Sequence, residues 1–218
     1  MKKALKIILL IAAIAMVLAI VFMVFAINIV GDKYEPNKHK AVLAEQLSPL
    51  ETELNNALED PSIDDYYKET LNKGRLIIAD DDKMLAITDS LFNSNPKKDF
   101  FYFMVFTRSM NGSDGFYSEA LDVSSHKFIL SNTVAFAHYF AGSTLLTETD
   151  MENWARYVIG ELFITNDANH AETIINEVNI LRSKLIKNVD GQEEKYKATI
   201  LLFLNKIDDA MWSKISLF

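Results

Sequence analysis

The hydrophobic pattern divides the chain into a first stretch that is apolar throughout and a longer part with apolar positions at helical spacing. The first stretch has 21 consecutive residues, Ile7 to Ile27, without a charge, a Pro or a Gly. At about 1.5 Å rise per residue, such a helix spans roughly 30 Å, the thickness of a bilayer's hydrocarbon core. We therefore expect residues 1–30 to form a transmembrane anchor that contacts membrane lipid through Ala4–Val30.

A long signal peptide that is cleaved and a buried core helix are the alternatives to a retained anchor. Signal peptides have an apolar region of about 7–15 residues, followed by a cleavage site with small residues. Ala13-Ile14-Ala15 has that form, but it lies in the middle of the run, with twelve more apolar residues after it. The position of this site favours retention of the anchor.

Charges beside the apolar run indicate its orientation. Three lysines and the amino terminus lie within the first six residues, and the next three lysines are spread over residues 33–40. The lysine count is a tie, but the amino-terminal charge and the closeness of the first group favour a cytoplasmic amino terminus. We expect a single-pass protein of the cytoplasmic membrane with its C-terminal domain outside the cytoplasm, in the periplasm if the cell is Gram-negative.

Residues 31–38 form a short polar segment that we interpret as a tether, and residues 39–218 follow as the extracytoplasmic domain. The sequence Ser48-Pro49-Leu50-Glu51 has the form of a capping box with Pro at the first helical position. It lies inside a helical stripe, so either a kinked helix or two helices in one register are predicted here. The stripe has apolar residues three or four positions apart: Leu43, Leu47, Leu50, Leu54 and Ala57.

Residues 99–106, "DFFYFMVF", are apolar almost all round and fit either a buried helix or a buried strand. Periodicity does not separate these alternatives in so short a run. The aromatic content favours a strand, whereas the helical pattern of the neighbouring segments favours a helix. We predict a central helix.

The C-terminal half shows apolar stripes at helical spacing, separated by short polar breaks. After the turn "NGSDG" at 111–115, we expect a helix from Phe116 to about Val123, and then a helix that Ser125 caps and Gly142 ends. Three more helices follow, starting near Thr147 or Thr149, at Asn166 or Asp167, and after the "DG" at 190–191. The predicted fold is all-α: a transmembrane helix and an irregular antiparallel bundle or array of about seven or eight helices.

Composition narrows the class of partner. Three of the 22 basic residues precede the anchor and none of the 30 acidic residues does, so the remainder has 19 basic residues and a formal net charge of −11. This charge argues against nucleic-acid binding, and it suits either a basic partner or simply a soluble surface. The chain has no Cys, which excludes disulfides and thiolate chemistry.

No motif in the sequence indicates catalysis, a cofactor or a metal site. The four histidines, at 39, 126, 138 and 170, do not pair at the three- or four-residue spacing of a helical metal site. The acidic run at 80–82 lacks the spaced ligands of a calcium loop and is better explained as a helix start. We assign no catalytic, cofactor-binding or metal-binding residue.

The segment "NGSDGFYSE", residues 111–119, is the strongest candidate for recognition, because aromatic side chains adjoin a polar turn. We predict a partner-binding site formed by Asp114, Phe116, Tyr117 and Glu119. The alternative is a loop whose aromatic side chains fold back into the core.

These observations favour a non-enzymatic, membrane-anchored module that binds another protein, which the charge suggests is basic. An envelope-assembly subunit and an immunity-type protein that neutralises a toxin both fit. A second hypothesis is a small-molecule or lipid sensor or carrier, with the aromatic segments 100–106 and 136–140 lining an apolar cavity. An anchored hydrolase ranks last, since no catalytic constellation is present.

Overall fold

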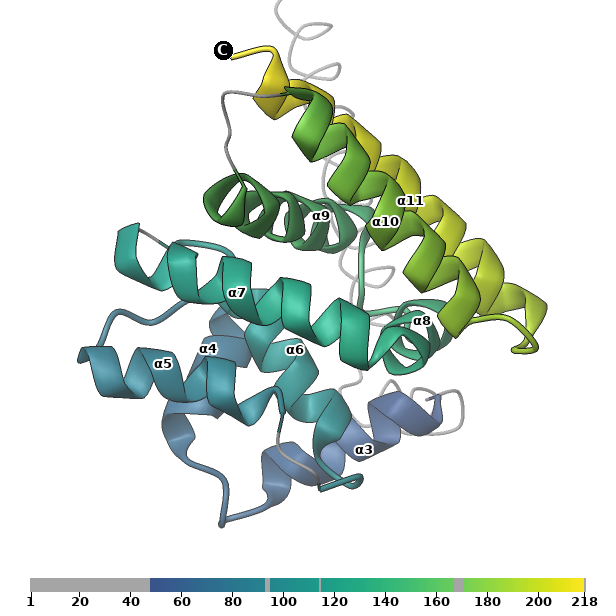
Figure 1. Ribbon diagram of the computed structural model, residues 1–218. Coiled ribbons are helices and arrows are strands. Elements are labelled where there is room, and N and C mark those ends of the chain that lie inside the picture. Colours follow the sequence, from purple (N-terminus) through teal and green to yellow (C-terminus); the bar gives the residue numbers. More distant parts are fainter. Residues whose placement is uncertain (1–47, 93–94, 114, 167–170, 218) are drawn as a thin grey trace, which may run out of the picture. The chain divides into compact units, whose positions relative to one another are not determined.

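The computed structural model describes residues 48–217, apart from 93–94, 114 and 167–170, and over these residues the chain forms helices and no strand (Figure 1). The predicted anchor and tether, and the start of the predicted domain, lie outside the described residues. Within the described part, no helix is both long and apolar enough to cross a membrane. The all-α prediction is confirmed for this part of the chain.

The described residues contain nine helices, against the seven or eight that the sequence predicts. They are α3 (Pro49–Glu59), α4 (Asp65–Lys73), α5 (Asp81–Ser90), α6 (Asp99–Ser109), α7 (Gly115–Ser131), α8 (Thr133–Gly142), α9 (Glu148–Thr165), α10 (Ala171–Asn188) and α11 (Glu194–Ile215).

Helix starts follow the capping residues of the sequence. The Ser48 hydroxyl accepts the Glu51 backbone N–H at 3.2 Å, and the Glu51 carboxylate accepts the Ser48 N–H at 3.0 Å, so the predicted capping box is present. Asp80 caps α5 by accepting the backbone N–H of Lys83 at 2.9 Å. These side chains satisfy N–H groups that have no partner within the helix.

The segment 99–106 is helical, as predicted, and forms most of α6. Phe100, Phe101, Phe103 and Phe106 are fully buried, because α6 packs against α3, α4, α5 and α9 and has little surface facing water. A helix that is apolar almost all round is stable only in such a central position.

The prediction that Ser125 caps a new helix is wrong. α7 continues through Ser125, which is fully buried, and ends at Ser131. The break falls at Asn132, and α8 starts at Thr133. The two predicted helices are therefore present, but the break between them lies at Asn132 and not before Ser125. α7 is longer than predicted as a result.

Of the two expected helix starts, Asn166 or Asp167, the first is wrong, and the second lies outside the described residues. Asn166 ends α9: its backbone N–H donates to the Leu162 carbonyl at 3.2 Å, and its side-chain amide donates to the same oxygen at 2.9 Å. A polar residue between two helices can cap either of them, so the sequence alone does not decide which.

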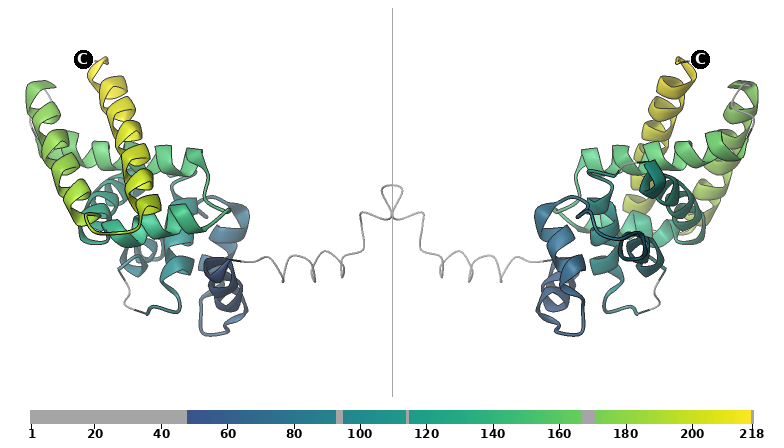
Figure 2. Two further views of the ribbon diagram at one scale, coloured as in Figure 1. Left: turned by 90° about the vertical axis from the view of Figure 1, so that its right-hand side faces the viewer. Right: turned by 90° about the vertical axis from the view of Figure 1, so that its left-hand side faces the viewer.

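α9 lies between α7 and α11, and its buried side chains form the centre of the core (Figure 1). Its Trp154 is fully buried among aromatic rings and donates its indole N–H to the Thr107 hydroxyl at 3.0 Å. α10 and α11 run antiparallel beside each other, with their connecting loop at the end near α8 (Figure 2). The rings around Trp154 belong to Phe103, Phe106, Phe128 and Phe136.

Candidate functional site

The predicted recognition segment brings together one exposed and one buried aromatic side chain. Phe116 is 52% exposed in the first turn of α7, and Glu119 is exposed one turn later. Tyr117 is 0% exposed, and its hydroxyl is 2.8 Å from the Ser109 hydroxyl. The expectation that Tyr117 is open to a partner is therefore wrong. Asp114 lies outside the described residues.

Hydrogen bonds hold the loop before α7 against two other elements. The Asn111 amide donates to the Gly74 carbonyl at 3.0 Å, and its oxygen accepts from the Asn153 amide of α9 at 3.2 Å. Gly112 has a φ of 84°, a left-handed conformation that favours glycine. Since Asn111 is engaged on both sides of its amide, this residue serves the structure of the loop.

A polar pocket of about 540 Å³ opens between this loop, the first half of α7, α9 and the end of α11. Its hydroxyl groups form a chain: Ser118 donates to Ser113 at 3.2 Å, Ser113 is hydrogen-bonded to the Tyr157 hydroxyl, and that hydroxyl also donates to the Met110 carbonyl at 3.2 Å. The lining residues are Met110, Asn111, Gly112, Ser113, Ser118, Asp122, Asn153, Arg156, Tyr157, Gly160 and Lys214.

Asp122 of α7 occupies space that Gly160 of α9 leaves free. A methyl group built on Gly160 would overlap the Asp122 carboxylate. α7 and α9 thus approach closely at this point, and only a residue without a side chain allows the carboxylate to stand there. The position of Asp122 is fixed by packing between two helices.

Burial raises the pKa of Asp122 to about 7, because a carboxylate removed from water favours its neutral form. Lys214 and Arg156 oppose this change in pKa, whereas Glu161 and Glu119 add to it. Burial also raises the pKa of Glu161, whose Oε2 is buried without a hydrogen-bond partner among the described residues.

Both cations of the pocket lie over aromatic rings. The Arg156 guanidinium is 5.1 Å from the Tyr157 ring centroid, and the Lys214 ammonium is 5.0 Å from that of Phe163. These are cation–π distances. Within the described part of the chain, neither cation forms an ion pair with Asp122, although all three side chains line one pocket.

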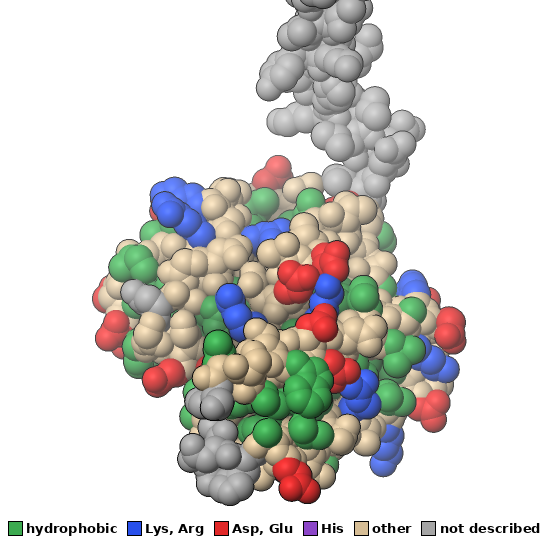
Figure 3. Space-filling model, turned by 90° about the horizontal axis from the view of Figure 1, so that it is seen from above, with side chains coloured by type: hydrophobic (Ala, Val, Ile, Leu, Met, Phe, Trp, Pro, Cys, Tyr) green, Lys and Arg blue, Asp and Glu red, His purple; other side chains and the backbone are tan. Residues whose placement is uncertain are grey.

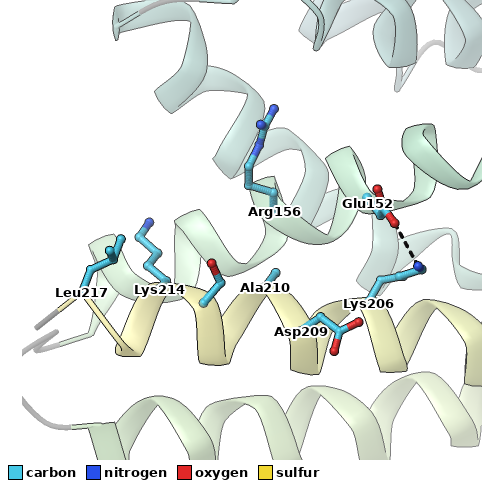
Figure 4. Close-up of a pocket in the computed structure, with 8 residues that line it drawn as sticks. Glu152, Arg156, Lys206, Asp209, Ala210, Lys214 and Leu217 are labelled. Atoms are coloured by element: carbon cyan, nitrogen blue, oxygen red, sulfur yellow. Dashed lines mark hydrogen bonds and ion pairs between the residues drawn. The ribbon is translucent and has the colours of Figure 1, made fainter.

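A second hollow, of about 470 Å³, shares the two cations Arg156 and Lys214 with the polar pocket, and Figure 4 shows the residues that line it. Arg156 extends from α9 and Lys214 from α11, and Lys214 lies beside Leu217. Lys206 donates to Glu152 at 2.9 Å across the far end of this hollow. Its lining is mainly apolar and includes Ala210.

The aromatic segments 100–106 and 136–140, proposed to line an apolar cavity, lie in the hydrophobic core. The Phe103 ring centroid is 4.7 Å from that of Tyr139, and the Phe136 centroid is 4.7 Å from that of Phe140. Phe100, Phe103 and Phe136 are each fully buried. These rings contact one another, and Tyr139 also lines a hollow of about 240 Å³ together with Phe92 and Phe128.

Charged side chains of both signs are mixed on the face that Figure 3 shows, and apolar side chains lie between them. Exposed apolar residues of the C-terminal helix include Leu201 (53% exposed) and Trp212 (54% exposed). The acidic excess of the sequence does not form a single-signed surface on this face.

Among the described residues, no three His, Asp or Glu side chains converge in a way that would hold a metal ion. His138 instead shares a 2.9 Å hydrogen bond with the Tyr196 hydroxyl, and burial lowers the pKa of His126. Both histidines are partly buried in the fold.

No protein-family model matches the chain, and no curated protein or solved structure does so. The site is interpreted from its own geometry. Sequence reasoning found the loop at 111–119 but missed Asp122, Arg156 and Gly160. An isolated Gly inside a helical pattern costs about 1 kcal/mol relative to Ala, so Gly160 was a usable signal of close packing.

Proposed function

We propose that this protein is a membrane-anchored, non-enzymatic interaction module that binds another protein outside the cytoplasm. The observation that carries the proposal is the exposed Phe116 ring in the first turn of α7, the helix whose Ser118 and Asp122 line the polar pocket. An exposed aromatic anchor beside polar groups is typical of binding hot spots.

A basic protein is the partner that suits this module. The part of the chain after the anchor has a formal net charge of −11, which speeds encounter with a basic partner and makes binding sensitive to salt. The anchor at 1–30 raises the effective concentration of the module near membrane-proximal partners. An envelope-assembly subunit and a toxin-neutralising immunity protein are the two uses that fit.

The alternative is a carrier or sensor of a small molecule or lipid. The observation that favours it is the hollow beside Ala210 and Leu217, whose surface is mainly apolar. A bound metabolite or lipid that copurifies with the full chain, instead of a protein, would favour this alternative.

The test is affinity purification of the full chain from its own cells in mild detergent. We expect one stoichiometric protein, and loss of about 2 kcal/mol or more of binding to it in Phe116→Ala, which is roughly a 30-fold weaker Kd. Leu201→Ala is the matched control, because it removes an equally exposed apolar side chain from α11. Equal capture by both variants would remove Phe116 from the interface, and absence of any copurified protein would refute the proposal.

A further inference from the structure

The Asp122 carboxylate stands in a polar pocket without a cation of its own. It forms no hydrogen bond or ion pair with any residue that the structure describes, although Arg156 and Lys214 line the same pocket. Those two cations are held over the rings of Tyr157 and Phe163 instead. A partly buried carboxylate without a partner is unfavourable, so a cation that enters the pocket gains a strong interaction.

The groups around Asp122 suit an ammonium group more than a second anion. Glu161, which has a buried oxygen without a hydrogen-bond partner among the described residues, and Glu119 add negative charge near Asp122. An ammonium has three N–H donors, and the hydroxyl oxygens of Ser113 and Ser118 line the same pocket as acceptors.

We infer that the pocket beside Asp122 is a binding site for an alkylammonium group, with the side chain of a lysine on a basic partner protein as its occupant. The carboxylate that Gly160 accommodates forms the ion pair, and the hydroxyls accept the remaining N–H groups. The choice of a lysine on a protein rests on the proposed function, whereas the affinity for ammonium does not.

The binding of an ammonium group depends on the ionisation of Asp122. Since the pKa of Asp122 is about 7, the carboxyl is mainly neutral in mildly acidic solution and mainly charged in mildly alkaline solution. Only the charged form attracts a cation. The charged groups that act on Asp122 are Lys214 and Arg156, which lower its pKa, and Glu161 and Glu119, which raise it.

The experiment uses the full chain in mild detergent, with ¹³C-labelled aspartate side chains followed by NMR. The probe is Nα-acetyl-lysine amide, and its norleucine counterpart, which lacks the ammonium, is the control ligand. We expect the lysine probe to shift the Asp122 carboxyl signal and to bind about 30-fold more tightly near pH 8.5 than near pH 5.5, in proportion to the ionised fraction of Asp122. The norleucine probe should leave the signal unchanged.

Asp122→Asn should abolish binding of the lysine probe, because the neutral amide keeps the shape and loses the charge. Asp209→Asn removes the same charge from the neighbouring hollow and should leave binding intact. Binding that is equal at both pH values, that survives Asp122→Asn, or that the norleucine probe matches would overturn the inference. The titration of the unmodified chain decides the question even if the Asn variant does not fold.

The two proposals fail in different ways. If a protein copurifies through Phe116 but the lysine probe does not bind, the ammonium site is refuted and the interaction module stands. If the probe binds but no protein copurifies, the pocket takes a small amine and the proposed function is refuted.

Discussion

Phe116 and Tyr117 are neighbours in the sequence, yet they have opposite surroundings. Successive residues of a helix point about 100° apart, so one side chain faces water while the next enters the core. The Tyr117 ring is buried with its hydroxyl bonded to Ser109, and the Phe116 ring is half exposed. The sequence placed both residues in one candidate site, but only Phe116 can contact a partner directly.

Single truncations separate the two roles. Tyr117→Ala leaves a cavity and should reduce the free energy of unfolding by about 3–5 kcal/mol, whereas Phe116→Ala should change it by no more than about half a kcal/mol. Thermal unfolding followed by circular dichroism measures both. A large loss of stability in Phe116→Ala would mean that its ring packs into the core.

The raised pKa of Asp122 gives the stability of the protein a pH dependence of known sign. Its pKa is about 7 in the folded chain against an ordinary 3.8, so the folded state binds more protons between these values. The effect of Asp122 on the free energy of unfolding is therefore most favourable below about pH 4 and becomes less favourable as the pH rises toward 7. Glu53, Asp99 and Glu161 act in the same direction, because burial raises each pKa.

Asp122→Asn should therefore unfold at a higher temperature than the unmodified chain at pH 7. The difference should shrink as pH falls toward 4, because the native carboxyl is then also neutral. Unfolding temperatures across this range, measured on both proteins in the same detergent, check the prediction. A difference that stays constant with pH would contradict the assigned ionisation.

Helix ends were predictable from the sequence where a side chain forms a local cap. Ser48 and Asp80 each bond to backbone N–H groups within three residues, so their effect is contained in a short segment. Ser125 and Asn166 were assigned to the wrong role, because a cap-forming residue also fits a buried helical position or a helix end. The decision between these depends on tertiary packing.

Gly160 controls the contact between α7 and α9. Gly160→Ala should destabilise the protein by about 1–3 kcal/mol, because its methyl group overlaps the Asp122 carboxylate. In an Asp122→Ala background the overlap is removed, so the same change should be neutral or stabilise by up to about 1 kcal/mol, as helix propensity favours Ala. Unfolding of the four proteins in this cycle gives both values, and equal effects in the two backgrounds would show that the residues do not meet.

At the scale of the molecule, the sequence predicted the all-helical class and the central position of residues 99–106. Helical spacing of apolar residues and the scarcity of turn residues carry that information locally. The polar pocket was not predictable in the same way, because it joins the loop at 111–113, Asp122, Gly160 and Lys214 from separate helices. Their proximity follows from packing between separate helices, which no short motif in the sequence indicates.

The predicted topology is testable through Ser62, which is exposed between α3 and α4. In the Cys-free chain, Ser62→Cys adds one thiol, and we expect it to react with a membrane-impermeant reagent in intact cells whose outer membrane, if present, has been permeabilised. Labelling only after lysis would place the domain in the cytoplasm. A mature protein that starts near residue 16 or 31 would show that the apolar run is cleaved.

The burial of Trp154 and the exposure of Trp212 give the chain two natural fluorophores in opposite surroundings. The chain has only these two tryptophans. Trp154 is enclosed by phenylalanine rings, and Trp212 is 54% exposed near the end of α11. A water-soluble quencher reaches the second and not the first, so the shielded emission reports folding. The quenchable emission reports events near the C-terminal end of α11, and it does so without any added label.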